Sequence, residues 1–188
     1  MNKSRCSWCG EDPLYMDYHD NEWGVPVFSD DKLFEFLVLE TFQAGLSWIT
    51  ILRKRENFSA AFDGFDYQKI ARYDEKKYEE LLLDAGIVRN KLKIRATIGN
   101  ALAFIEVQKE YGTFSKYLWQ FTNGKPINNQ WKNLKQVPAT TSVSDLISKD
   151  LKKKGFKFVG STVVYAYMQA IGMVNDHVEE CFRNQALI

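Results

Sequence analysis

Two histidines and a set of cysteines are the side chains best suited to bind a metal. The chain has only two His, and each has a Cys companion, Cys6 with His19 and His177 with Cys181. On a helix, the i, i+4 spacing of the second pair would place imidazole and thiolate on one face, as two corners of a tetrahedral zinc site. Cys6 and His19 could close the other corners from a loop. Four protein ligands leave no position for water, so such a zinc would be structural.

The spacing alone leaves other interpretations open. Cys6-x-x-Cys9 is itself a zinc half-site, so a set of Cys6, Cys9, His177 and Cys181 would be chemically acceptable. The thiols and imidazoles could also be unrelated to one another. Asp176, next to His177, is either a hydrogen-bond partner that orients the imidazole or an exposed helix cap.

Glu40 is a carboxylate on the apolar face of a predicted helix. It lies seven, four and three positions after Leu33, Phe36 and Leu37, so it shares their inward-facing stripe. Desolvating a carboxylate there is costly unless donors or a cation meet it. Either Glu40 lies at the edge of the stripe and bonds a tyrosine, or it lines a pocket. A carboxylate ringed by aromatic side chains could hold a flat base that bears N–H groups; the candidate rings are Tyr15, Tyr18, Trp23 and Trp48.

Residues 83–91 predict a hairpin between two helices, with its turn at Gly86 to Val88. In a helix-hairpin-helix motif, such a turn presents backbone N–H groups to a DNA phosphate. Four cations and no carboxylate lie between positions 89 and 95, namely Arg89, Lys91, Lys93 and Arg95. A second basic cluster lies at 149–157. Each cluster could be an ordinary solvated face, but two of them on a neutral chain favour nucleic acid.

Short helices are expected to position these side chains. Apolar periodicity and capping residues predict them over 29–44, 47–62, 66–73, 74–85, 90–112, 144–154 and 161–174. Gly86 should end the fourth helix in the left-handed conformation. Residues 123–142 are polar and predict a loop, and only 156–159 suggest a strand. We therefore predict an all-α fold in a single domain, 1–188.

Composition narrows the classes of protein further. The 188 residues are 45% apolar and 26% charged, which excludes a disordered or fibrous chain. A net charge of +1 excludes the global positive field of a histone-like binder. Three Cys are too few for a disulfide framework, and no apolar run approaches the about 20 residues of a membrane span. We expect a cytoplasmic protein with no membrane partner.

Four segments together resemble the 3-methyladenine DNA glycosylase I family of the helix-hairpin-helix superfamily. They are residues 12–24 (DPLYMDYHDNEWG), 39–49 (LETFQAGLSWI), 154–160 (KGFKFVG) and 173–177 (MVNDH). The resemblance implies a helix-hairpin-helix glycosylase fold in which zinc joins the terminal segments, about 1–25 and 175–188. It also implies the zinc ligands Cys6, His19, His177 and Cys181, and so prefers His19 over Cys9.

The family's roles map onto the candidate residues named above. Glu40 would be the catalytic, hydrogen-bonding carboxylate and Trp48 a stacking ring, with Tyr15, Tyr18 and Trp23 as pocket wall. Together with the hairpin, the resemblance predicts DNA contacts at Gly86, Val88, Arg89 and Lys91. The expected activity is hydrolysis of the N-glycosidic bond of 3-methyladenine in double-stranded alkylated DNA. No lyase lysine is evident, so we expect a monofunctional, monomeric enzyme.

Two other classes of protein share part of this pattern. A non-catalytic helix-hairpin-helix module with structural zinc would bind DNA, but it has no use for a carboxylate among aromatic rings. A zinc hydrolase would need an open coordination position. Glu40, Trp48 and the ligand set therefore discriminate between the three.

Overall fold

Capping side chains define where several helices begin. The Asp66 carboxylate accepts from the backbone N–H groups of residues 68 and 69, Asp74 from residue 77, and Asn90 from residues 92 and 93. These three predicted caps are confirmed. Asp12 and Thr141 cap two further helices in the same way. The cap positions are local features of the chain, which is why sequence reasoning could find some of them, such as Asp66 and Asp74.

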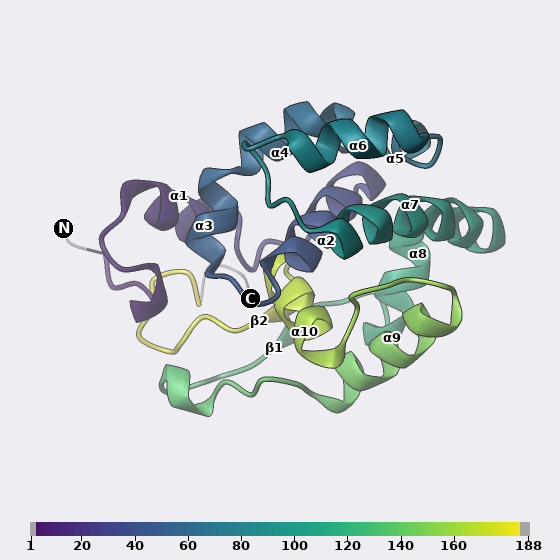
Figure 1. Ribbon diagram of the computed structural model, residues 1–188. Coiled ribbons are helices and arrows are strands. Elements are labelled where there is room, and N and C mark those ends of the chain that lie inside the picture. Colours follow the sequence, from purple (N-terminus) through teal and green to yellow (C-terminus); the bar gives the residue numbers. More distant parts are fainter. Residues whose placement is uncertain (1–2, 185–188) are drawn as a thin grey trace.

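The computed structural model describes residues 3–184, and it is mostly helical (Figure 1). Its α-helices are α1 (Pro13–Asn21), α2 (Asp30–Gln43), α3 (Trp48–Arg53), α4 (Arg55–Ala61), α5 (Tyr67–Ile70), α6 (Glu75–Leu83), α7 (Lys91–Tyr111), α8 (Phe114–Trp119), α9 (Ser142–Lys153) and α10 (Ser161–Ala170). Single-turn 3-10 helices are η1 (Ser7–Cys9), η2 (Asp63–Phe65), η3 (Gln120–Thr122) and η4 (Leu134–Gln136). Strands β1 (Ile127–Asn128) and β2 (Val174–Asn175) form one short parallel pair. None of the described helices is long and apolar enough to cross a membrane.

Helix α2 is the centre of the core. All its residues from Leu33 to Phe42 are buried, because α7, α8, α10 and α3 pack around it. Figure 1 shows α2 in the middle of the molecule, with α4 to α6 above it and α9 and α10 below. A helix that is buried all round can hold a polar side chain away from water. Glu40 is on this helix.

Some predicted elements differ from the structure. The helix predicted over 47–62 breaks at Lys54, and the Ser47 hydroxyl bonds the Thr50 hydroxyl instead of capping backbone N–H groups. The strand suggested at 156–159 is wrong, since this segment is a turn in which Phe158 has a φ of 57°. Helix α10 ends before Val174, which belongs to β2. Gly86 does not adopt a positive φ, because α6 ends earlier and the Asp84 carboxylate accepts from its N–H.

The two ends of the described chain lie side by side, as the purple and yellow segments in Figure 1 show. The backbone N–H of Phe182 donates to the carbonyl of Ser4 at 2.9 Å. The segment after β2 is built from turns, so His177 and Cys181 are not on a helix as predicted. The turns nevertheless bring their side chains together beside Cys6.

Candidate active site and metal cluster

Glu40 lies in the wall of a cavity. It is 3% exposed, although it carries an ionisable carboxyl group. No group within residues 3–184 hydrogen-bonds this carboxyl, which rules out the alternative of a tyrosine partner among them. Burial alone raises the pKa of Glu40 to about 8. Burial therefore favours the neutral form of this side chain at neutral pH.

The cavity has a volume of about 360 Å³ and is largely aromatic. It contains every aromatic residue predicted to surround Glu40, together with one further ring, Trp8, that the sequence did not suggest. Its described lining residues are Trp8, Tyr15, Tyr18, Trp23, Glu40, Gln43, Trp48, Leu134, Val137, Pro138, Ala166, Gln169 and Asp176. None of these is Lys or Arg, and two are carboxylates. The cavity can therefore accept a flat, positively charged ligand.

The rings of the cavity support one another and leave two indole donors free. The ring centroids of Tyr18 and Trp48 are 5.4 Å apart, and those of Trp8 and Trp23 are 4.9 Å apart. The indole nitrogens of Trp8 and Trp48 are buried and have no hydrogen-bond partner in the described part of the chain. Unpaired buried donors are rare in proteins.

Asp176 is the cavity residue whose environment the sequence did not predict. It neither caps a helix nor orients His177, as the two sequence interpretations required. Instead it is buried, and four side chains from other segments donate to its two oxygens, namely Asn129, Trp131, Tyr165 and Gln169. Its position within the segment 173–177 was visible, but none of its partners is near it in sequence except Gln169.

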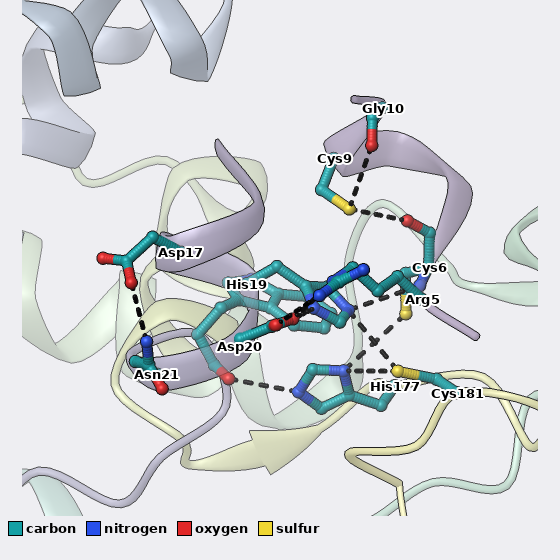
Figure 2. A network of polar contacts seen from close by, with 11 residues as sticks. Arg5, Cys6, Cys9, Gly10, Asp17, His19, Asp20, Asn21, His177 and Cys181 are labelled. Carbon is teal, nitrogen blue, oxygen red and sulfur yellow. Dashed lines mark hydrogen bonds and ion pairs between the residues drawn. The ribbon is translucent and has the colours of Figure 1, made fainter. Parts of the chain in front are cut away.

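The predicted metal ligands converge on one point (Figure 2). The ligand atoms of Cys6, His19, His177 and Cys181 all lie within 4.8 Å of one another, and all four residues are buried. Zn–S bonds of about 2.3 Å and Zn–N bonds of about 2.0 Å put neighbouring ligand atoms roughly 3.5 Å apart. The S···N distances fit this, at 3.4 Å from Cys181 to either imidazole and 3.7 Å from Cys6 to His177. The cluster could hold a tetrahedral metal ion.

Cys9 lies outside this cluster. Its thiol points to the backbone carbonyls of Cys6 and Gly10, at 3.2 and 3.8 Å (Figure 2). The alternative ligand set, with Cys9 in place of His19, is therefore wrong, because His19 and not Cys9 lies with the other three residues.

Groups around the cluster fix both imidazoles. The Asp20 carboxylate lies 2.9 Å from Nδ1 of His19 and is itself held by Arg5 at 2.7 Å (Figure 2). Nε2 of His177 lies 3.1 Å from the backbone carbonyl of Trp23. Each imidazole thus turns its remaining nitrogen to the thiols, as metal-binding histidines do. Because Trp23 also lines the cavity, the cluster and the cavity share a wall.

The two thiols of the cluster are electrostatically unequal. A hydrogen bond from Cys6, with further bonds from the two imidazoles, lowers the pKa of Cys181. The hydrogen bond to Cys181 and burial raise the pKa of Cys6. The thiolate form of Cys181 is thus stabilised, whereas that of Cys6 is disfavoured. A cation between the two sulfurs would favour the thiolate form of both residues.

The hairpin predicted over 83–91 joins α6 to α7, and all four predicted contact residues lie on it. Arg89 and Lys91 are exposed, and neither forms an ion pair in the described part of the chain. Gly86 packs against α4, where a Cβ would come within 3.2 Å of Asn57. Val88 is half-buried beside it.

Two of the four cations assigned to the hairpin have other partners. Lys93 is 6% exposed, and its ammonium donates to the carbonyls of Phe42 and Ala44 at the end of α2, at 2.8 and 2.6 Å. Arg95 pairs with Glu75 and stacks on Tyr78. The basic cluster is therefore smaller than predicted, and Lys93 instead ties the start of α7 to the helix that carries Glu40.

The second basic cluster lies where α9 turns into α10. Lys149, Lys152, Lys153 and Lys157 are exposed there, whereas Lys154 pairs with Glu110 at 2.8 Å. The turn is held from within, because the buried Asn100 side chain both donates to and accepts from the backbone of Lys157. The hairpin between α6 and α7 and the hairpin between α9 and α10 thus both present cations to solvent.

Comparison with known proteins agrees with this arrangement. The sequence model of the family described as methyladenine glycosylase matches residues 8–184. DNA-3-methyladenine glycosylase 1 of Escherichia coli (strain K12) is 52% identical over 177 residues, which cover 94% of this chain and 95% of that protein. A crystal structure of 3-methyladenine DNA glycosylase I has a TM-score of 0.93 at 49% identity, covering 95% of this chain and 98% of that one.

A further solved structure contains a ligand. It is a variant of 3-methyladenine DNA glycosylase I in complex with 3-methyladenine, with a TM-score of 0.93 at 34% identity. The match covers 96% of this chain and 97% of that one. The similarity therefore extends over nearly the full length of each of these proteins.

Proposed function

The chain belongs to the methyladenine glycosylase family, and from this premise we propose that it acts in DNA base-excision repair. It hydrolyses the N-glycosidic bond of 3-methyladenine in alkylated DNA, releasing the free base and leaving an abasic site. The observation that carries the proposal is Glu40, a buried carboxyl group without a protein partner among residues 3–184, in an aromatic cavity.

The charge of the substrate explains why such a cavity suffices. Methylation at N3 makes the adenine of a nucleotide cationic, so the base is already a good leaving group. A damaged base also costs less to flip out of the duplex. We propose that Trp48 stacks on the flipped base, that Tyr15, Tyr18 and Trp23 form the wall, and that Glu40 accepts from its N–H edge. The cavity then selects the base by charge, shape and hydrogen bonding together.

Glu40 ties recognition to the charge of the base. Burial raises the pKa of Glu40 to about 8, so its ionised form is disfavoured. A cationic base placed beside it favours that ionised form. A neutral adenine supplies no such compensation. Binding of the damaged base and ionisation of Glu40 therefore reinforce each other.

We propose that the DNA backbone contacts the hairpin between α6 and α7 as a helix-hairpin-helix motif. Gly86 and Val88 would present backbone to a phosphate, and Arg89 and Lys91 would add attraction that does not depend on sequence. The exposed lysines between α9 and α10 give a second contact of the same kind. Two anchoring points suit a duplex that is bent while a base is flipped.

We propose that Cys6, His19, His177 and Cys181 hold a structural Zn²⁺. The donor set, the burial of all four residues and the fixed imidazoles support this. With four protein ligands, the ion would stabilise the junction of the two chain ends and supply no open site for water. This coordination argues against a zinc hydrolase.

The remaining proposals concern the chain as a whole. We propose one glycosylase domain over 1–188, supported by a continuous core cluster from Tyr18 to Val174. We propose a monofunctional enzyme, because the described cavity residues include no lysine amine for a lyase step. We propose a monomer in the cytoplasm, and this location is supported by three cysteines that form no disulfide in the described chain.

Base release from alkylated duplex DNA tests the proposed function. The protein and its Glu40→Gln variant are incubated with methylated duplex, and free 3-methyladenine is measured by chromatography. We expect the variant to be slower by at least about 10²-fold, in the range for loss of a group that acts on the reacting base, while it still binds DNA. If the unaltered protein released no more base than the variant, a non-catalytic DNA-binding module would be the better description.

A further inference from the structure

Asp176 is a cavity carboxylate whose oxygens are fully used by protein donors. The residue is 1% exposed. One oxygen accepts from Asn129 Nδ2 at 2.7 Å and Trp131 Nε1 at 2.8 Å. The other accepts from the Tyr165 hydroxyl at 2.7 Å and Gln169 Nε2 at 2.8 Å. The two oxygens of a carboxylate can accept about four hydrogen bonds, and these four donors fill them, so each neighbour here must turn a donor to Asp176.

This requirement fixes the direction of the Gln169 carboxamide. Its NH₂ group must face Asp176, so its carbonyl oxygen points to the other side of the same planar group. Gln169 lines the cavity and is half-buried. Within residues 3–184, no donor bonds this oxygen. Gln169 therefore presents a free acceptor, whose orientation follows from the hydrogen bond that its NH₂ group donates to Asp176.

The backbone around Gln169 is held as firmly as its side chain. Its carbonyl accepts from the N–H of Gly24 at 3.0 Å, and the carbonyl of Ile171 accepts from Val27 at 3.0 Å. These bonds fasten the end of α10 to the segment that follows Trp23. The acceptor is thus placed by rigid contacts on both sides, as a recognition group needs to be.

We infer that Gln169 determines specificity by accepting a hydrogen bond from one hydrogen of the 6-amino group of the bound base, which leaves the other hydrogen for Glu40, and that Asp176 is the residue that positions Gln169. The inference rests on the proposed function, which supplies the ligand. Adenine carries an N–H donor at position 6, where guanine carries a carbonyl acceptor. An acceptor facing another acceptor leaves both unpaired in a buried site, which is costly. The substrate class is therefore 6-aminopurines, and 6-oxopurines are rejected.

Binding of two free bases tests this assignment. The full-length protein with its metal is titrated with 3-methyladenine and with 3-methylhypoxanthine, which has an oxo group in place of the 6-amino group. The fluorescence of the cavity tryptophans reports binding. Gln169→Met removes the acceptor at nearly constant volume, and Gln68→Met, on the exposed face of α5, is the matched control.

We expect the unaltered protein and Gln68→Met to prefer 3-methyladenine equally. Gln169→Met should reduce that preference at least 10-fold, mainly through weaker binding of 3-methyladenine. An unchanged preference in Gln169→Met would overturn the inference alone. If the unaltered protein bound neither base, the proposed function would fail, and this inference with it.

Asp176→Asn tests the positioning role separately. An amide at 176 can donate, so Gln169 can rotate and turn its NH₂ group into the cavity. For variant protein that keeps its metal content and unfolding temperature, we expect the preference to shift toward 3-methylhypoxanthine. Retention of the original preference would show that Asp176 does not orient Gln169. If Asp176→Asn failed to fold, the base preference of Gln169→Met would decide whether the inference holds.

Discussion

The metal cluster and the base cavity lie against each other, yet they treat buried polar groups in opposite ways. In the cluster, each imidazole has one nitrogen bonded to Asp20 or to the carbonyl of Trp23 and the other turned to the thiols. In the cavity, Glu40 and the indole nitrogens of Trp8 and Trp48 have no partner within residues 3–184.

This difference indicates that the polar groups of the cluster stabilise the fold, whereas those of the cavity bind a ligand. A polar group that is buried and satisfied stabilises the fold, whereas one that is buried and unpaired lowers stability until a ligand meets it. A metal ion would bond the four ligand atoms of the cluster, and a bound base would give Glu40 a hydrogen-bond partner in the cavity. Asp176 is the informative exception, since it lines the cavity but is saturated by protein donors. We therefore assign it to positioning and Glu40 to binding.

The largest effect is expected from the cluster. If the proposed ion is bound, His177→Ala should abolish metal binding and reduce the free energy of unfolding by more than about 4 kcal/mol, because the ion would join the N- and C-terminal segments of the described chain. Chelation of the unaltered protein should do the same. Elemental analysis and thermal unfolding measure both effects. Cys9→Ala is the matched control, because its thiol lies outside the cluster, and it should keep its metal. Metal-free protein of unchanged stability would contradict a structural role.

In the cavity, by contrast, we expect a substitution that increases the free energy of unfolding at high pH. Burial raises the pKa of Glu40 to about 8 in the folded protein, so its stabilising contribution is fully present below the unfolded value and is lost as pH rises through 8. Glu40→Gln cannot ionise. We expect the variant to be more stable than the unaltered protein by roughly 5 kcal/mol at pH 9, because a rise in pKa from 4.5 to about 8 corresponds to about 1.4 kcal/mol per unit, and to be similar at pH 4.5. Chemical unfolding at a series of pH values measures this, and parallel pH profiles would be inconsistent with a buried, ionisable Glu40.

Lys93 supports the cavity without touching the cluster. Its ammonium caps two carbonyls at the end of α2, close to Glu40 along the same helix. Lys93→Met removes these charge-assisted bonds and should destabilise the protein by about 2 kcal/mol while leaving the metal content unchanged. The exposed Lys91→Met is the control for loss of charge. Equal stability of the two variants would show that the Lys93 cap contributes nothing.

Sequence reasoning found what local chemistry determines. The caps at Asp66, Asp74 and Asn90 depend on residues two or three positions away, and the inward face of Glu40 follows from helical periodicity. Residue types and spacing named the four converging residues as one possible ligand set and the family resemblance selected it, although His177 and Cys181 meet through turns and not on a helix, as the i, i+4 argument assumed. In that case residue types were informative where the assumed geometry was wrong.

What sequence reasoning missed depends on long-range contacts. The partners of Asp176 include Asn129 and Trp131, more than forty positions away. Lys93 looked like one of four hairpin cations, but its acceptors are on a helix about fifty positions earlier. Charge patterns along a chain do not reveal which cations are already paired in the fold. Only the packing of α2 against α7 determines that.

The smallest effects are expected on the surface, outside both regions. Arg89→Ala with Lys91→Ala should weaken binding to undamaged duplex about 10-fold, and each lost phosphate contact should reduce the slope of log affinity against log salt by about 1. Lys152→Ala with Lys157→Ala tests the second hairpin in the same way. Because these cations are exposed and form no ion pair in the described chain, metal content and pH-dependent stability should not change. Salt titrations of DNA binding measure the slopes. If the first pair left both affinity and slope unchanged while the second pair reduced them, the phosphate-binding hairpin would be the one between α9 and α10.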